Sequence, residues 1–256
     1  YIFFSDKLIE NPNDHLFATL SKYPFIYREA LKTYQADLPM CFENLVVGNS
    51  KDGIWYDYGF YDDPQGPISK KQLSGKYVKE AAIFLKKYYN VQFDDNRVYK
   101  NLINKMIHHK GRGKKHVSDH FYVSIFSRMQ DRLLLNEMEI MKELEQRFGL
   151  MVRIVQLEVL AFNEIIEIMS STIVSIGLHG SALIYTMFMP SNSVLLELFP
   201  YAVPGENYTP YRTLAWLPDI DLNYKMWINH NATCNYSQVG SRKKIDNLTP
   251  EAFLNI

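Results

Sequence analysis

The chain of 256 residues has few cysteines, no excess of either charge and no long apolar run. Its two cysteines, Cys41 and Cys234, are too few for a disulfide framework or a cysteine zinc site, and the sequence leaves a single bridge between them open. No stretch approaches the roughly 18–20 apolar residues that span a bilayer, and Tyr1–Phe4 is too short for a signal peptide. Any membrane anchor is therefore expected outside this chain.

The balance of charge disfavours one large class of function. The chain has 28 Lys plus Arg and 28 Asp plus Glu, so its formal net charge is zero. A protein that binds nucleic acid without sequence preference usually has a positive excess, because neutralising phosphates supplies most of its affinity. We expect no nucleic-acid partner, and we interpret the basic segment 105–116, which contains no Phe, Tyr or Trp, as a solvated loop.

The second half of the chain alternates short apolar segments with amphipathic ones. The pattern predicts strands over 120–126, 152–157, 172–176 and 194–198, separated by helices over 132–148, 162–169 and 182–188. Such alternation predicts an α/β fold with a parallel sheet built from βαβ units. Upstream we expect strands over 1–4 and 41–48, helices over 14–22 and 26–35, and a helix over 76–89 capped by Ser74.

Ligands of parallel sheets bind at the carboxyl ends of the strands, and the first of these ends carries two arginines. Arg128 and Arg132 follow the strand over 120–126 and stand four residues apart. Two guanidinium groups at that spacing can converge on one phosphate, to which each offers a planar pair of donors. The other interpretation is a pair of surface arginines that balance Asp131 and Glu137.

Two further strand ends add polar groups of the same kind. His179, Gly180 and Ser181 form a small-residue turn that lets a helix N-terminus approach a diphosphate, and His179 can donate a hydrogen bond to a phosphate or a sugar hydroxyl. The turn matches neither a dinucleotide fingerprint nor a P-loop, which disfavours hydride transfer and ATP hydrolysis. Glu197, near the end of the fourth strand, either accepts hydrogen bonds from a ribose diol or merely closes the strand. Together the three ends predict a nucleoside-diphosphate pocket.

The same segments resemble glycosyltransferase family 61. The likeness includes Phe126–Glu137, Leu178–Gly180, Glu197–Val203 and Asn207–Ala215, and it extends over residues 1–228. It implies a GT-B-like fold with a Rossmann-type, nucleotide-sugar-binding domain over 76–228. It also implies an N-terminally truncated acceptor-side domain with an interdomain loop in 1–75, and a C-terminal tail over 229–256.

The resemblance also implies an activity. It is the inverting transfer of N-acetylglucosamine from UDP-GlcNAc to O-mannose on a glycoprotein, in the lumen of the endoplasmic reticulum or Golgi. The donor-binding residues would be Arg128, Arg132, Asn136, His179, Gly180, Ser181, Glu197 and Tyr208. Trp55 and Tyr56 would belong to an acceptor-side loop, and Asp57 is the candidate for the catalytic base. No cofactor or metal is expected beyond the UDP-sugar co-substrate, since fixed cations can stabilise the leaving UDP.

Two alternatives remain open at this point. One is a relative within the family that uses another donor, such as UDP-xylose, or that modifies EGF repeats with N-acetylglucosamine. The other is a catalytically inactive scaffold that keeps the fold.

Glycosylation sequons that begin at Asn207, Asn231, Asn235 and Asn247 favour a protein of the secretory pathway.

Overall fold

A computed structural model describes residues 3–4, 21–24, 26–27, 74–91, 122–129, 133–206 and 209–231. The chain divides into two compact units, Tyr1–Ser50 and Lys51–Ile256, so the division lies upstream of the expected boundary at residue 75. In the first unit, β1 (Phe3–Phe4) pairs in parallel with β2 (Ile26–Tyr27). The predicted helix over 26–35 is therefore wrong at its start. Ile26 is β-branched and Tyr27 is aromatic, and such residues favour extended backbone when they pair with another strand.

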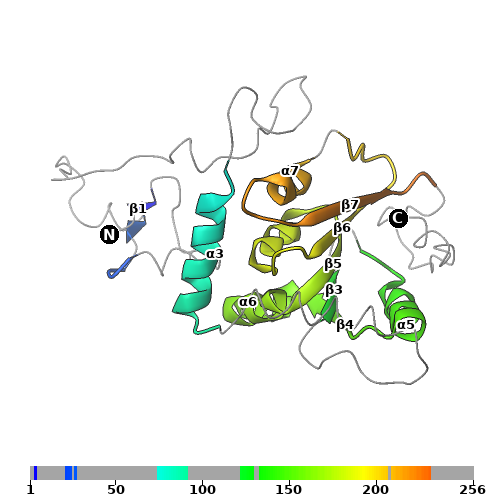
Figure 1. Ribbon diagram of the computed structural model, residues 1–256, viewed down its shortest axis with the longest axis horizontal. Helices are drawn as coiled ribbons and strands as arrows, with labels where there is room; N and C mark the ends of the chain where they lie inside the picture. The colour runs from blue at the N-terminus through cyan, green and yellow to red at the C-terminus, as the bar shows by residue number, and fades with distance from the viewer. Residues whose placement is uncertain are drawn as a thin grey trace. The chain divides into compact units, whose positions relative to one another are not determined.

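The second unit contains a five-stranded parallel sheet (Figure 1). Its strands are β3 (Tyr122–Ser127), β4 (Val152–Gln156), β5 (Thr172–Leu178), β6 (Val194–Phe199) and β7 (Asn223–Ile228). They lie in the order β4-β3-β5-β6-β7, and every neighbouring pair is parallel. The strand order thus reverses between β3 and β5, and this is the point at which open α/β sheets bind ligands. The predicted parallel sheet is confirmed, whereas β7 was not predicted.

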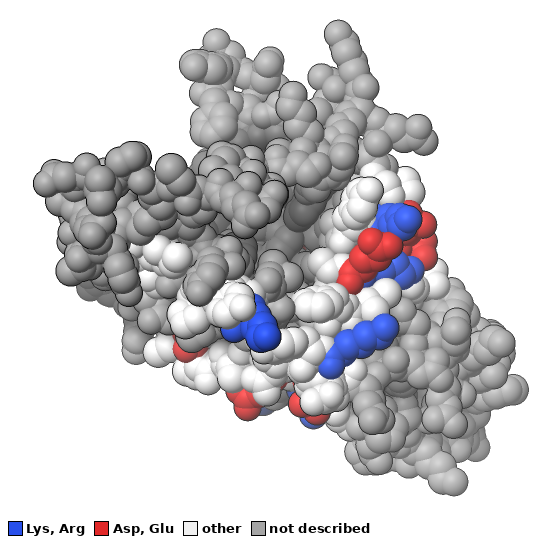
Figure 2. Space-filling model, turned by 90° about the vertical axis from the view of Figure 1, so that its left-hand side faces the viewer, with Lys and Arg blue, Asp and Glu red and all other residues white. Residues whose placement is uncertain are grey.

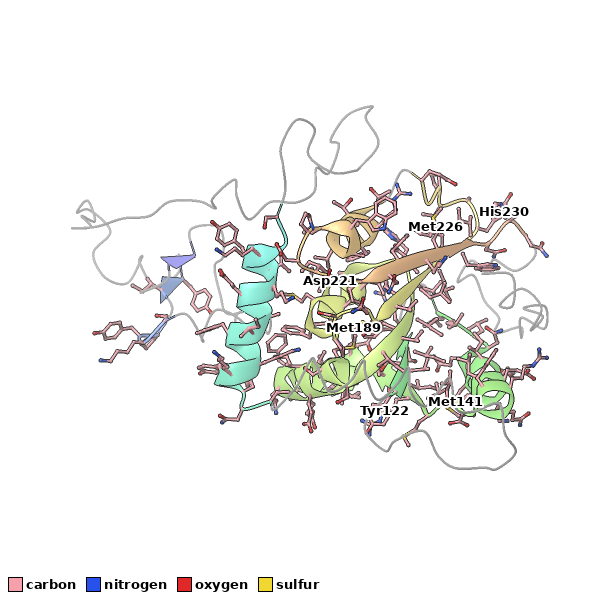
Figure 3. The ribbon with its side chains drawn as sticks, viewed as in Figure 1. Tyr122, Met141, Met189, Asp221, Met226 and His230 are labelled. Atoms are coloured by element: carbon pink, nitrogen blue, oxygen red, sulfur yellow. The ribbon has the colours of Figure 1, made fainter. Side chains whose placement is uncertain are left out.

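Helices cover both faces of this sheet (Figure 1). On one face, α5 (Glu137–Phe148) packs over Val123 and Ile125. On the other face, a second cluster of buried apolar side chains contains Phe126 of β3. Its other side chains come from four helices: α3 (Lys76–Tyr88), α6 (Phe162–Ser170), η4 (Ser181–Phe188) and α7 (Pro210–Trp216). A short helix, η3 (Leu157–Val159), follows β4. Met141 and Met189 belong to the two different clusters (Figure 3). Since side chains alternate along a strand, β3, β4 and β6 each supply residues to both clusters.

Two helices differ from their predicted form. The helix after β3 begins at Glu137 instead of residue 132, and it ends as predicted at Gly149, which has φ 63°. The segment after β5 is a 3₁₀ helix instead of an α-helix. There the Leu183 N–H donates to Gly180 O at 3.0 Å, and the Thr186 hydroxyl donates to Leu183 O at 2.7 Å. Both bonds join residues three positions apart, and this tightens the turn. The first one uses the Leu183 N–H, which in the first turn of an α-helix would be free to bind a ligand.

The start of α3 is tied to the sheet unit. The N-cap of α3 is Gly75 and not the predicted Ser74, because the Gly75 carbonyl accepts the first helical hydrogen bond, from the Lys79 N–H at 2.9 Å. Ser74 lies one residue earlier, and its Oγ accepts a hydrogen bond from the Lys76 N–H at 3.1 Å. The Gly75 N–H donates to Pro218 O at 2.8 Å. A Cβ at Gly75 would come within 2.4 Å of that same oxygen, so the close approach requires glycine. Among the helices within the described ranges, none combines the length and hydropathy needed to cross a bilayer.

Gly177 is where a side chain would disturb the sheet next to its ligand edge. A Cβ there would lie 2.8 Å from Leu183 Cδ2 and 3.0 Å from Phe126 Cδ2. We expect Gly177→Ala to lower the free energy of unfolding by about 1–3 kcal/mol through overpacking. Urea denaturation of the variant alone and in a Leu183→Val background measures this. The second substitution should reduce the loss, and equal losses in both backgrounds would contradict the account.

Candidate functional site

The carboxyl ends of β3, β5 and β6 form one edge of the sheet. In the registers, Ile125 lies opposite Ile176, and Leu178 lies opposite Leu198. Arg128 comes three residues after Ile125, and His179 comes three residues after Ile176. The two residues therefore leave the sheet at neighbouring strand ends. The His179 N–H donates to Leu198 O at 2.8 Å, which ties the end of β5 to β6. Two predicted site residues therefore flank the point where the strand order reverses.

A chain of hydrogen bonds joins three strands behind His179. His179 Nδ1 lies 2.7 Å from Glu197 Oε1, and the Tyr224 hydroxyl donates to Glu197 Oε2 at 2.6 Å. Because a carboxylate oxygen only accepts hydrogen bonds, Glu197 favours the imidazole form whose proton is on Nδ1. The side chain of His179 is 15% exposed, and that of Glu197 is 0% exposed. The imidazole thus reaches the surface while its carboxylate partner is enclosed.

The position of Glu197 corrects one prediction. Glu197 lies within β6, opposite Gly177 of β5 and Met226 of β7. Its carboxylate is fully buried, and each oxygen accepts a hydrogen bond from the protein. This arrangement does not support direct contact with a ribose diol, because such contact needs an accessible carboxylate. The structure instead couples Glu197 to His179.

Aromatic rings hold the imidazole of His179 from two directions. Phe199 stacks on it, with ring centroids 4.9 Å apart and an interplanar angle of 20°. Tyr211 of α7 meets it edge-on at 6.0 Å. Phe199 and Tyr211, like Tyr224, were not predicted as site residues. Since side chains of a strand alternate between faces, the apolar–polar pattern of Asn223–Ile228 was the available signal for Tyr224.

A second polar group lies on the α5 side of the same edge. The Ser127 hydroxyl donates to Glu137 Oε1 at 3.1 Å, which links the end of β3 to the first turn of α5. Within the described residues, Arg128 Nη1 and Asn136 Oδ1 are buried without a hydrogen-bond partner. A buried guanidinium N–H without an acceptor is costly, so the group is suited to receive an anion. Both residues were predicted to bind the donor.

The remaining predicted residues divide into two sets. Gly180 is buried and Ser181 is exposed at the start of η4, beside His179. The others lie outside the described residues: Arg132, Tyr208, Trp55, Tyr56 and Asp57. Their assigned roles stay predictions. The structure therefore brings His179 and Glu197 into direct contact and places Arg128 at the adjacent strand end.

Charge is dispersed over the visible surface. On the face drawn in Figure 2, described basic and acidic side chains lie in small separate groups among uncharged residues. Over the described part of the chain, His, Cys, Asp and Glu form no group of three that could hold a metal ion.

Comparison with known proteins agrees with the resemblance seen in the motifs. Protein O-linked-mannose beta-1,4-N-acetylglucosaminyltransferase 2 of Homo sapiens is 35% identical over 230 residues, which is 89% of this chain and 35% of that protein. The proteins of the same name from Mus musculus and Xenopus laevis are 35% and 32% identical, again over 89% of this chain and 35% of theirs. The chain thus spans about a third of the length of these curated relatives.

The family itself follows from a match to a family profile. The family profile described as Glycosyltransferase 61 matches residues 15–196, which include β3, β4, β5 and the turn at His179. The match covers more than half of the chain, and the strand ends that carry Arg128 and His179 lie inside it. The chain belongs to glycosyltransferase family 61.

Proposed function

We propose that this chain forms the donor-binding part of an inverting transferase that moves N-acetylglucosamine from UDP-GlcNAc to O-mannose on a glycoprotein. The family supports glycosyl transfer, and the names of the relatives support this sugar and this acceptor. The observation that carries the proposal is the buried, unpartnered Arg128 Nη1 beside the reversal of strand order. An anion at that edge would supply the missing acceptor.

The chemistry explains why cations belong there. In an inverting transfer an acceptor hydroxyl attacks the anomeric carbon as the bond from that carbon to the UDP oxygen breaks. Negative charge then develops on the diphosphate, and fixed donors that already point at it lower the barrier. We assign this role to Arg128 and His179, with Gly180 and Ser181 lining the approach. These side chains would do the work without a metal cofactor.

The rest of the proposal concerns architecture and location. We assign the five-stranded unit to the donor half of a GT-B enzyme, with residues 1–75 contributing to an acceptor-side domain. The separate compact unit Tyr1–Ser50 is compatible with that division. Asp57 is the candidate for the base that deprotonates the acceptor. We further propose a lumenal location in the endoplasmic reticulum or Golgi, because O-mannosylated acceptors are glycoproteins of the secretory pathway.

The donor site can be tested with UDP alone. We expect Arg128→Ala to weaken UDP binding roughly 10- to 100-fold, since hydrogen bonds to charged groups contribute about 1.5–3 kcal/mol each. Isothermal titration calorimetry measures the affinity. Arg147→Ala is the matched control, because Arg147 pairs with Glu143 on the exposed side of α5. Equal affinities of Arg128→Ala and the unmodified chain would contradict the assignment.

The donor sugar is tested by competition. We expect UDP-GlcNAc to displace UDP more effectively than UDP-xylose, because a site shaped for the N-acetyl group loses contacts with a sugar that lacks it. Displacement by UDP-xylose at lower concentration would instead support the other donor. A folded chain that binds neither nucleotide would favour the inactive scaffold.

A further inference from the structure

We propose that Tyr224 is a positioning residue for donor binding, because it fixes the orientation of His179 through the buried carboxylate of Glu197. The inference rests on the proposed function, in which His179 meets the donor diphosphate. Tyr224 lies on β7, outside the motifs that indicated the family, and past residue 196, where the family match ends. Its part in the site follows from its contact with Glu197.

The first step concerns the hydrogen-bond donors that the buried carboxylate of Glu197 requires. A carboxylate with no exposed surface is costly unless donors satisfy both of its oxygens. Tyr224 supplies a donor to Oε2 at 2.6 Å, and His179 approaches Oε1 at 2.7 Å. Burial and, to a lesser extent, the neighbouring Glu197 charge raise the pKa of Tyr224 above its usual value. The phenol therefore stays protonated at physiological pH and continues to donate.

The second step concerns rigidity. Three adjacent strands supply the three residues: His179 follows β5, Glu197 lies in the middle of β6, and Tyr224 lies in β7 opposite Leu195. None of the contacts depends on a long loop. If the Tyr224 hydroxyl is removed, Glu197 Oε2 loses its donor inside the protein, and the carboxylate must rotate or accept water. Either change alters the hydrogen bond that orients the imidazole.

The third step separates this role from packing. The ring of Tyr224 also meets Trp216 edge-on at 6.3 Å. Tyr224→Phe keeps that ring contact and removes only the hydroxyl. Tyr185→Phe is the matched control, since Tyr185 packs beside Phe162 against the same sheet face without contributing to the site.

The experiment uses the whole chain and two measurements. Calorimetry gives the affinity for UDP, and proton NMR of the ligand-free, ¹⁵N-histidine-labelled chain gives the Nδ1–H resonance of His179. We expect Tyr224→Phe to weaken UDP binding roughly two- to tenfold, the size of effect that one hydrogen bond supports, and to move the imidazole resonance. Tyr185→Phe should change neither.

Each outcome decides the proposal. Unchanged affinity and unchanged resonance in Tyr224→Phe would overturn it. If that variant does not fold, the unmodified chain still decides: a Tyr224 hydroxyl proton protected from solvent exchange together with a His179 proton on Nδ1 supports the arrangement. A Tyr224 hydroxyl in fast exchange, or a His179 proton on Nε2 alone, overturns it. Absence of UDP binding by the unmodified chain would overturn the proposed function instead, and the ligand-free resonance would still report whether Tyr224 orients His179.

Discussion

A carboxylate without exposed surface sets the conditions for this site. Glu197 lies in β6 between two other strands, where desolvation would be prohibitive unless each oxygen accepted a hydrogen bond. The side chains of β5 and β7 meet that need, so the strand order itself brings His179 and Tyr224 to the same group. The stability of the sheet and the orientation of the imidazole thus depend on the same pair of contacts.

Through His179, the carboxylate of Glu197 is connected to the edge of the sheet where we propose that the donor binds. His179 emerges where β5 ends, beside the strand end that carries Arg128, and both flank the reversal of strand order. On the proposed function, Arg128 and His179 approach the donor diphosphate from neighbouring strand ends, since each comes three residues after the paired Ile125 and Ile176. A site built in this way holds its charged groups in place before the donor arrives, as electrostatic stabilisation of a leaving group requires.

Much of the fold was predictable because apolar periodicity reports directly on elements that are long and buried. The four predicted strands and the helix end at Gly149 were found where the pattern placed them, within a few residues. The conformation of η4 was not predictable, since a hydroxyl contact of Thr186 and packing against the sheet decide it. The strand β7 was missed because its alternating, mixed-polarity segment lies between turns outside the regular repeat of strand and helix.

The site residues that could be predicted are those that directly follow a predicted strand. Arg128 and His179 could be identified from their places after apolar segments, but the burial of Glu197 depends on which strands lie beside β6, and sequence alone does not give the strand order. The central claim is that the edge carrying Arg128 and His179 binds the nucleotide. A ¹H–¹⁵N NMR titration with UDP tests it most directly. The account predicts shifts of the amides of residues 127–129 and 179–181, with little change at the opposite strand ends, near Val152 and Val194. Shifts confined to that opposite edge would contradict it.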